Sequence, residues 1–203
     1  MSFPRRGLIL EGVTGAGKSS TLAALARCAE RPPWLQSARL ISEDETLGEL
    51  MSEDLQDPSR SVAERTARLT RILALVAAAP PGAPAFLLER FHLSYYALQP
   101  DWAPHVAMDA ALAEHGFRQV LLTLPEAEIR RRSLHRVDRA EEEWAQGMIA
   151  CFGSEERALE ALVASRTRRL ASCAWTRLPT LILDTSAMDW DEIARQIAVF
   201  CTD

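Results

Sequence analysis

The chain has 203 residues, of which 48% are hydrophobic and 25% charged, a length and balance typical of one folded domain. This composition argues against extensive disorder, and the net charge of −5 argues against binding of long nucleic acid, which usually requires a basic face. No apolar run approaches the ~20 residues of a membrane span, and the N-terminus lacks the pattern of a signal peptide. The four cysteines fit no CxxC or zinc-binding spacing, so we expect a cytoplasmic protein with reduced thiols.

Short apolar runs alternate along the chain with stretches of helical periodicity. The runs predict strands over residues 8–10, 38–42, 85–88, 119–124 and 181–183. The periodic stretches predict helices over residues 19–29, 61–79, 106–114, 141–151, 154–173 and 189–200, with a further helix opened by Pro125. This alternation predicts an α/β fold, in which a five-stranded parallel sheet carries helices on both faces. No repeat or linker divides the chain, so we expect a single domain over residues 1–203.

A glycine-rich motif follows the first predicted strand. The run Gly12-Val13-Thr14-Gly15-Ala16-Gly17-Lys18-Ser19 fits G-x-x-x-x-G-K-[ST] in full, between a buried strand and an amphipathic helix. Its glycines let backbone N–H groups approach phosphate oxygens, and the helix adds its positive end. Lys18, the only lysine in the chain, should reach the β- and γ-phosphates of ATP, and the Ser19 hydroxyl should bind Mg²⁺. We therefore predict an ATP site built from Gly12, Thr14, Gly15, Ala16, Gly17, Lys18, Ser19 and Ser20.

Charged residues follow two of the other predicted strands, at the sheet edge where parallel sheets bind ligands. Glu89 is placed to hold Mg²⁺ and Arg90 to grip a phosphate, although an isolated Glu-Arg pair could equally be a solvated strand exit. Glu43 is the candidate base if the acceptor is a hydroxyl, and a candidate sugar contact if the acceptor is already a phosphate. The alternative is that Glu43 belongs to an acidic helix start that complements the helix dipole.

Two stretches resemble the thymidylate kinases and the related deoxynucleoside kinases. Residues 89–99, Glu89-Arg90-Phe91-His92-Leu93-Ser94-Tyr95-Tyr96-Ala97-Leu98-Gln99, are similar to a family stretch in which an acid and an arginine precede an aromatic residue. Residues 11–20, which place Glu11 before the glycine-rich loop, are similar to the family's P-loop. The resemblance implies a P-loop kinase fold, a Mg-ATP-dependent phosphotransferase, and a nucleoside or nucleoside monophosphate as the small-molecule phosphate acceptor. It also implies a homodimer.

Weaker similarities extend the resemblance over nearly the whole chain. The arginine-dense stretch after Pro125 is similar to the family's lid, which implies a lid at about 130–143 with Arg136 and Arg139 at the γ-phosphate. The same arginines could instead form a solvated face. The last predicted strand and the loop after it are similar to the family's adenine side, which implies that Thr185 contacts the nucleotide.

Three further residues are candidates for contacting the acceptor. Arg68 lies at about the spacing of the family's base-contacting arginine, although Arg65 or Arg71 would serve nearly as well. Phe91 and Tyr95 could stack an acceptor base, although aromatic residues near strand ends are more often part of the core. Together with Glu43 and Arg90, they complete the predicted acceptor site.

Two departures from the family pattern leave the acceptor open. Thr14 replaces an acid that the family usually carries in the P-loop. Residues 42–49 keep the family's glutamate as Glu43 but lack the arginine that helps to seat an acceptor phosphate. The missing arginine raises the prospect of an unphosphorylated acceptor beside a nucleoside monophosphate, and both departures leave open a kinase of another small hydroxyl compound. An ATP-hydrolysing regulatory protein is the alternative from a different class.

Overall fold

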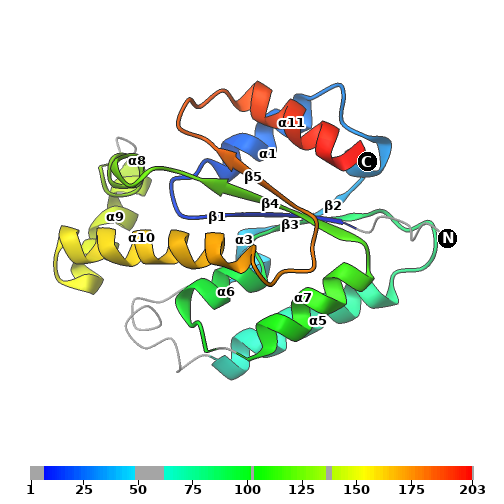
Figure 1. Cartoon of the computed structure of the whole chain (residues 1–203), viewed down its shortest axis with the longest axis horizontal. Helices are drawn as coiled ribbons and strands as arrows, with labels where there is room; N and C mark the ends of the chain where they lie inside the picture. Colours follow the sequence, from blue (N-terminus) through cyan, green and yellow to red (C-terminus); the bar gives the residue numbers. More distant parts are fainter. Residues whose placement is uncertain (1–6, 49–61, 102, 136–138, 203) are drawn as a thin grey trace.

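Five parallel strands form one sheet with the order β2-β3-β1-β4-β5. The computed structural model shown in Figure 1 describes residues 7–48, 62–101, 103–135 and 139–202. The strands are β1 (Gly7–Gly12), β2 (Arg39–Ile41), β3 (Phe86–Glu89), β4 (Phe117–Thr123) and β5 (Thr180–Asp184). The α/β fold with a five-stranded parallel sheet, which the sequence predicted, is confirmed.

The central strand β1 carries the glycine-rich loop at its carboxyl end. All six of its residues are buried, because β3 and β4 flank it and helices cover both faces of the sheet. The register pairs Leu10 of β1 with Glu89 of β3, and Gly12 of β1 with Leu122 of β4. The carboxyl ends of these strands therefore meet at one edge of the sheet, where ligands of such sheets bind.

Helices form a layer on each face of the sheet. Figure 1 shows α1 (Lys18–Arg27) and α11 (Trp190–Thr202) over one face, and α5 (Val62–Ala78), α6 (His92–Leu98), α7 (Pro104–Glu114) and α10 (Glu155–Ser172) over the other. None of the helices in the described parts of the chain has the length and apolarity needed to cross a membrane. The remaining helical elements are α2 (Pro33–Gln36), α3 (Glu43–Thr46), α8 (Glu126–Ile129), the π-helix η2 (Arg130–Leu134) and α9 (Arg139–Phe152).

The helix α6 is absent from the sequence prediction, and a physical reason for this is visible in the structure. Its N-cap residue, Phe91, has no side-chain oxygen that could accept a hydrogen bond from the first turn. The carboxylate of Glu11, 83 positions earlier in the chain, accepts this bond from the Ser94 N–H instead, and it also accepts one from the Phe91 N–H. The sequence pattern also missed the π-helix η2, and it made β2 longer than the three residues observed.

The buried face of β3 should be important for stability. Leu88 is fully buried on this inner strand, whereas 47% of Leu40 on the edge strand β2 is exposed. We expect Leu88→Ala to lower the free energy of unfolding by about 2–5 kcal/mol, because it leaves a cavity in the core. The matched change Leu40→Ala should cost within about 0.5 kcal/mol. Urea denaturation measures both, and equal effects would contradict the assigned burial.

Candidate active site

The loop between β1 and α1 adopts a conformation that requires glycine at two positions. Gly15 and Gly17 have φ values of 79° and 84°, in the left-handed region that favours glycine. Space is a second constraint, since a β-carbon at Gly15 would lie 2.6 Å from Ser133 Oγ and one at Gly17 would lie 2.2 Å from the Trp190 ring. The lid segment and the start of α11 therefore pack directly against this loop.

Hydroxyl groups from distant segments hold the carbonyl oxygens of the loop. Ser133 Oγ in η2 donates to the Thr14 carbonyl at 2.7 Å, and Thr185 Oγ1 after β5 donates to the Ala16 carbonyl at 2.9 Å. Arg132 in turn donates to the Thr185 carbonyl at 2.8 Å. Thr185, the candidate nucleotide contact, is fully buried, so its side chain supports the loop from beneath.

Two cavities adjoin at the end of the P-loop. The larger has a volume of about 710 Å³, and its wall includes the P-loop, η2, α9 and the residues before α11. The smaller has a volume of about 130 Å³ and extends towards α6, α9 and α10. The residues that line both cavities are Thr14, Glu43, Arg90 and Trp144. The larger cavity also contains Lys18, Ser19 and Ser20, three of the residues predicted to bind ATP.

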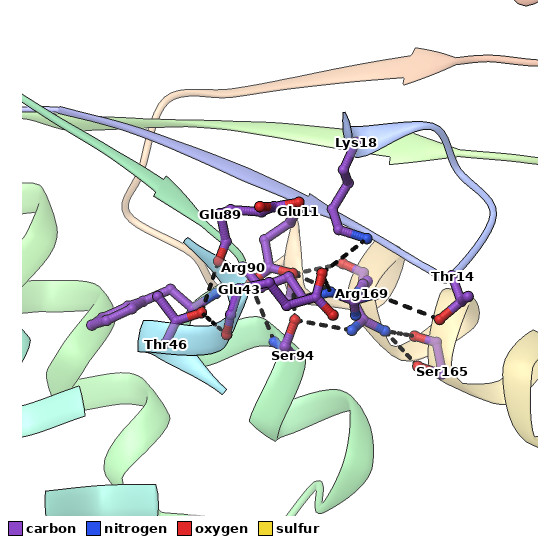
Figure 2. A network of polar contacts seen from close by, with 12 residues as sticks. Glu11, Thr14, Lys18, Glu43, Thr46, Glu89, Arg90, Ser94, Ser165 and Arg169 are labelled. Atoms are coloured by element: carbon purple, nitrogen blue, oxygen red, sulfur yellow. Dashed lines mark hydrogen bonds and ion pairs between the residues drawn. The ribbon is translucent and has the colours of Figure 1, made fainter. Parts of the chain in front are cut away.

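Lys18, Glu43 and Arg90 form a charged cluster where the two cavities meet (Figure 2). Arg90 Nε lies 2.8 Å from Glu43 Oε2, and Lys18 Nζ lies 3.7 Å from the same oxygen. Burial, assisted by the positive charge of Arg90, lowers the pKa of Lys18 to about 7. Burial alone would raise the pKa of Glu43, but the charges of Arg90 and Lys18 outweigh it and hold that pKa below its usual value.

The backbone of Arg90 has an unusual conformation. Its φ of 59° is uncommon for a residue with a side chain, and it occurs where the chain turns from β3 into α6. The Arg90 N–H donates to the Leu10 carbonyl at 2.9 Å, which continues the pairing of β3 with β1 for one more residue. This turn directs the guanidinium to Glu43, and a terminal nitrogen also lies 3.5 Å from Thr14 Oγ1.

A second charged pair lies next to this cluster and is buried. Glu11 Oε1 accepts hydrogen bonds from the backbone N–H groups of Phe91 (2.7 Å) and Ser94 (3.2 Å), and Oε2 accepts one from Ser94 Oγ (2.8 Å). Arg169 of α10 lies 3.5 Å from Glu11 Oε2 and also donates to Ser94 Oγ and Ser165 Oγ. Burial lowers the pKa of Arg169 to about 10, so its guanidinium remains charged at neutral pH.

Of the predicted acceptor residues, three lie away from the two cavities and two line them. Phe91 is fully buried in the core, and the Tyr95 hydroxyl donates to the carbonyls of Thr46 and Leu47. Arg68 contacts Glu64 and the Asp44 carbonyl. None of these three residues lines either cavity, whereas Glu43 and Arg90 line both. The roles of the three in binding an acceptor remain predictions.

The described part of the lid presents other arginines than the two predicted. Arg136 lies outside the described residues, and Arg139 begins α9 but its side chain is not among those described. Arg131 and Arg132 of η2 line the larger cavity, and the Arg132 guanidinium lies 5.4 Å from the centre of the Trp190 ring. The sequence indicated the arginine density but not which members face the cavity.

Of the two residues predicted to hold Mg²⁺, Ser19 lines the larger cavity and Glu89 does not. Ser19 offers an exposed hydroxyl in the larger cavity, and Glu89 ends β3 with a half-buried carboxylate whose charge raises the pKa of Lys18. No group of three or more His, Cys, Asp or Glu side chains in the described ranges could hold a metal ion. Mg²⁺ suits such a sparse oxygen site, because phosphate groups and water normally complete its coordination.

This sheet order, with a P-loop at the end of β1 and a lid before α10, is the fold of the P-loop kinases. Three solved structures resemble it. The YorR protein of Bacillus subtilis, in complex with phosphorylated GDP, has a TM-score of 0.59 and 16% identity, with coverage of 97% of this chain and 95% of its own. Deoxyadenosine kinase from M. mycoides with bound dATP has a TM-score of 0.58 and 12% identity, with coverage of 97% and 100%.

The third structure is thymidylate kinase from Candida albicans, with a TM-score of 0.58 and 13% identity over 97% of this chain and 91% of its own. No protein-family model matches the sequence, and no curated protein matches it. The likeness therefore confirms the P-loop kinase fold, with structural neighbours among the deoxynucleoside and thymidylate kinases. At these identities it does not identify a substrate.

The depressed pKa of Lys18 can be measured directly, since the chain has one lysine. We expect the single ¹³C-ε lysine NMR signal to titrate at about pH 7 in the free protein. Phosphate charge stabilises the ammonium form, so AMP-PNP should raise this pKa. Affinity for AMP-PNP should consequently fall as pH rises through 7, by up to about tenfold per unit, until the pKa of the complex is reached. Arg90→Met should raise the pKa of Lys18 in the free protein. A pKa near 10.5 in the unchanged protein would contradict the burial of Lys18.

The enclosed Glu11–Arg169 pair should matter for stability. Arg169→Met leaves the Glu11 carboxylate buried without its cation, and we expect a cost of about 3–5 kcal/mol in the free energy of unfolding. The exposed Arg157 on the same helix is the control, and Arg157→Met should cost within about 0.5 kcal/mol. Combining Arg169→Met with Glu11→Gln should cost less than the sum of the single changes. Additive effects in urea denaturation would show that the two side chains are not coupled.

Proposed function

We propose that this protein is a Mg-ATP-dependent kinase that transfers the γ-phosphoryl group of ATP to a hydroxyl group of a small, uncharged acceptor. The observation that carries the proposal is the position of Glu43, which lines both cavities and contacts both Arg90 and Lys18. In this assignment ATP occupies the larger cavity and the acceptor the smaller one. The second cavity favours an acceptor kinase over an ATP-driven regulatory protein, which needs no such site.

The charges favour a hydroxyl acceptor over a monophosphate. Two arginines line the smaller cavity, and each is paired with a carboxylate: Arg90 with Glu43, and Arg169 with Glu11. An acceptor phosphate would have to compete with both carboxylates. A hydroxyl group instead needs one hydrogen-bond acceptor, and the Glu43 carboxylate is ionised because its pKa is lowered.

In the proposed mechanism, ATP changes the partners of the charged cluster. Lys18 and the N–H groups of the P-loop bind the β- and γ-phosphates, with Arg132 beside them. Once Lys18 binds phosphate, Glu43 loses one of the two cations that hold its pKa down, and it becomes a better acceptor for the hydroxyl proton. Mg²⁺, held by Ser19 and Glu89 together with the phosphates, would supply further neutralisation of phosphate charge. Arg90 keeps the carboxylate oriented.

An ADP-formation assay with three variants tests this proposal, and the acceptors include nucleosides, because a deoxyadenosine kinase shares the fold, together with small neutral alcohols. We expect Lys18→Ala to lower kcat/KM on the order of 10²- to 10³-fold, because it removes a charge contact to the phosphates. Glu43→Gln should lower kcat roughly 10²- to 10⁴-fold with little change in the KM for ATP. The exposed neighbour Asp44 is the control, and Asp44→Asn should leave kcat unchanged.

Two results would count against the proposal. Full activity of Glu43→Gln would exclude this residue as the base. Turnover of monophosphates in preference to neutral acceptors would identify a monophosphate kinase instead. The homodimer implied by the family resemblance and the cytoplasmic location remain predictions, and analytical ultracentrifugation would check the first.

A further inference from the structure

The smaller cavity has a polar end and an apolar end. Its polar end is the junction with the ATP cavity, where Glu43 and Arg90 lie. The apolar side chains of Met148, Phe152 and Leu162 come from α9 and α10, and α10 also contributes Ser165 and Arg169 to the lining. Met148 and Leu162 are buried, and both belong to the same hydrophobic cluster as Leu8 and Leu10 of β1. An acceptor that places a hydroxyl at Glu43 therefore extends its body into a hydrophobic wall.

The polar groups of this cavity already have partners. The Arg169 guanidinium donates to Glu11, Ser94 and Ser165, and Ser94 Oγ donates to Glu11. Glu43 contacts Arg90 and Lys18. Of these groups, Glu43 is the one that ATP would release from a cation. Among the described residues of this lining, Glu43 is therefore the carboxylate that a ligand can reach, at the end where the γ-phosphate is expected.

The apolar side chains Met148, Phe152 and Leu162 offer no hydrogen bond to a nucleobase, and the arginine and serine groups of α6 and α10 in the lining are already paired. Among the described residues that line this cavity, none has a carboxamide or an imidazole, and the indole of Trp144 lies at the boundary with the ATP cavity. A nucleobase carries several donors and acceptors on its edge, and each one buried without a partner weakens binding by roughly ten- to a hundredfold. A hydrocarbon body meets no such penalty and gains from leaving water.

We propose, on the basis of the proposed kinase function, that the acceptor is an uncharged alcohol with a compact hydrocarbon body about the size of one six-membered ring. The volume of about 130 Å³ sets the size, because an apolar cavity of about 150 Å³ accommodates benzene. The hydroxyl lies at Glu43, and the ring or branched chain lies between Met148, Phe152 and Leu162. This assignment excludes nucleosides as the preferred acceptors.

The reaction balances without another reactant. The alcohol oxygen forms a bond to the γ-phosphorus of ATP, and the bond from that phosphorus to the bridging oxygen of ADP breaks. The hydroxyl proton passes to Glu43 and then to solvent. The products are ADP, an alkyl phosphate and one proton.

The test compares neutral alcohols with nucleosides on the full-length protein. Benzyl alcohol, cyclohexylmethanol and 3-methylbutanol form one set, and thymidine, deoxyadenosine and thymidine monophosphate form the other. Binding is measured by ligand-observed NMR in the presence of AMP-PNP and magnesium, and turnover is measured by ADP formation with ATP. We expect the alcohols to bind, and at least one to be phosphorylated with a kcat/KM at least tenfold above that of any nucleoside.

A cavity-filling variant locates the binding site. Ala161 lines the cavity from α10, so Ala161→Leu should occupy the space of the ring and raise the KM for the alcohol at least tenfold. The affinity for AMP-PNP should not change. Ala171 is exposed on the same helix, and Ala171→Leu is the matched control with an unchanged KM. Thermal unfolding of both variants checks that they remain folded.

The outcomes separate this inference from the proposed function. Preferred turnover of a nucleoside or monophosphate would overturn the alcohol acceptor and leave a kinase in place. Binding of the alcohol that Ala161→Leu abolishes, but without phosphoryl transfer to any acceptor, would overturn the kinase function and support the apolar character of the cavity. Absence of both binding and turnover of the alcohols would overturn the inference, as would an equal KM in Ala161→Leu and the wild type.

Discussion

The Glu11 carboxylate is the interaction on which the arrangement of this site depends. It lies fully buried at the end of β1, immediately before the P-loop, where an isolated charge would be strongly destabilising. Four groups compensate it: two N–H groups at the start of α6, the Ser94 hydroxyl and the Arg169 guanidinium. The strand of the P-loop, the helix after Arg90 and the helix α10 are thereby joined at one point. Figure 2 shows how close this point lies to the Lys18–Glu43–Arg90 cluster.

The buried Glu11–Arg169 pair supports the charged cluster, and its own contacts can stay the same when a ligand binds. Glu11 and Arg169 neutralise each other next to the site, while Lys18, Glu43 and Arg90 stand where a ligand can reach them. Burial and the nearby Arg90 lower the pKa of Lys18 to about 7, so the charge of this side chain changes near neutral pH. In the proposed function, a phosphate of ATP would supply negative charge beside this lysine, so binding of ATP and protonation of Lys18 would favour each other. The same exchange of partners would leave Glu43 as a stronger base.

The parts of the site that depend on residues close together in the chain could be predicted from the sequence. The P-loop is one, since glycines at positive φ, a helix start and a single lysine lie within eight consecutive residues. Glu43 and Arg90 are others, because each follows a predicted strand and parallel strands end at a common edge. Arg169 could not be predicted in this way. It lies within a helix rich in arginine, and its importance comes from Glu11, 158 positions away.

The sequence by itself determined the fold class and predicted a phosphate-binding loop. Hydrophobic periodicity and turn residues act over a few positions, so they specify the order of strands and helices and the phosphate-binding loop. Only the tertiary structure decided which side chains face a cavity and which are buried. Phe91 and Tyr95 point into the core, while Trp144, Met148 and Phe152 line the smaller cavity. Which side chains face a cavity depends on packing between elements that are distant in the chain, so a local sequence pattern cannot predict it.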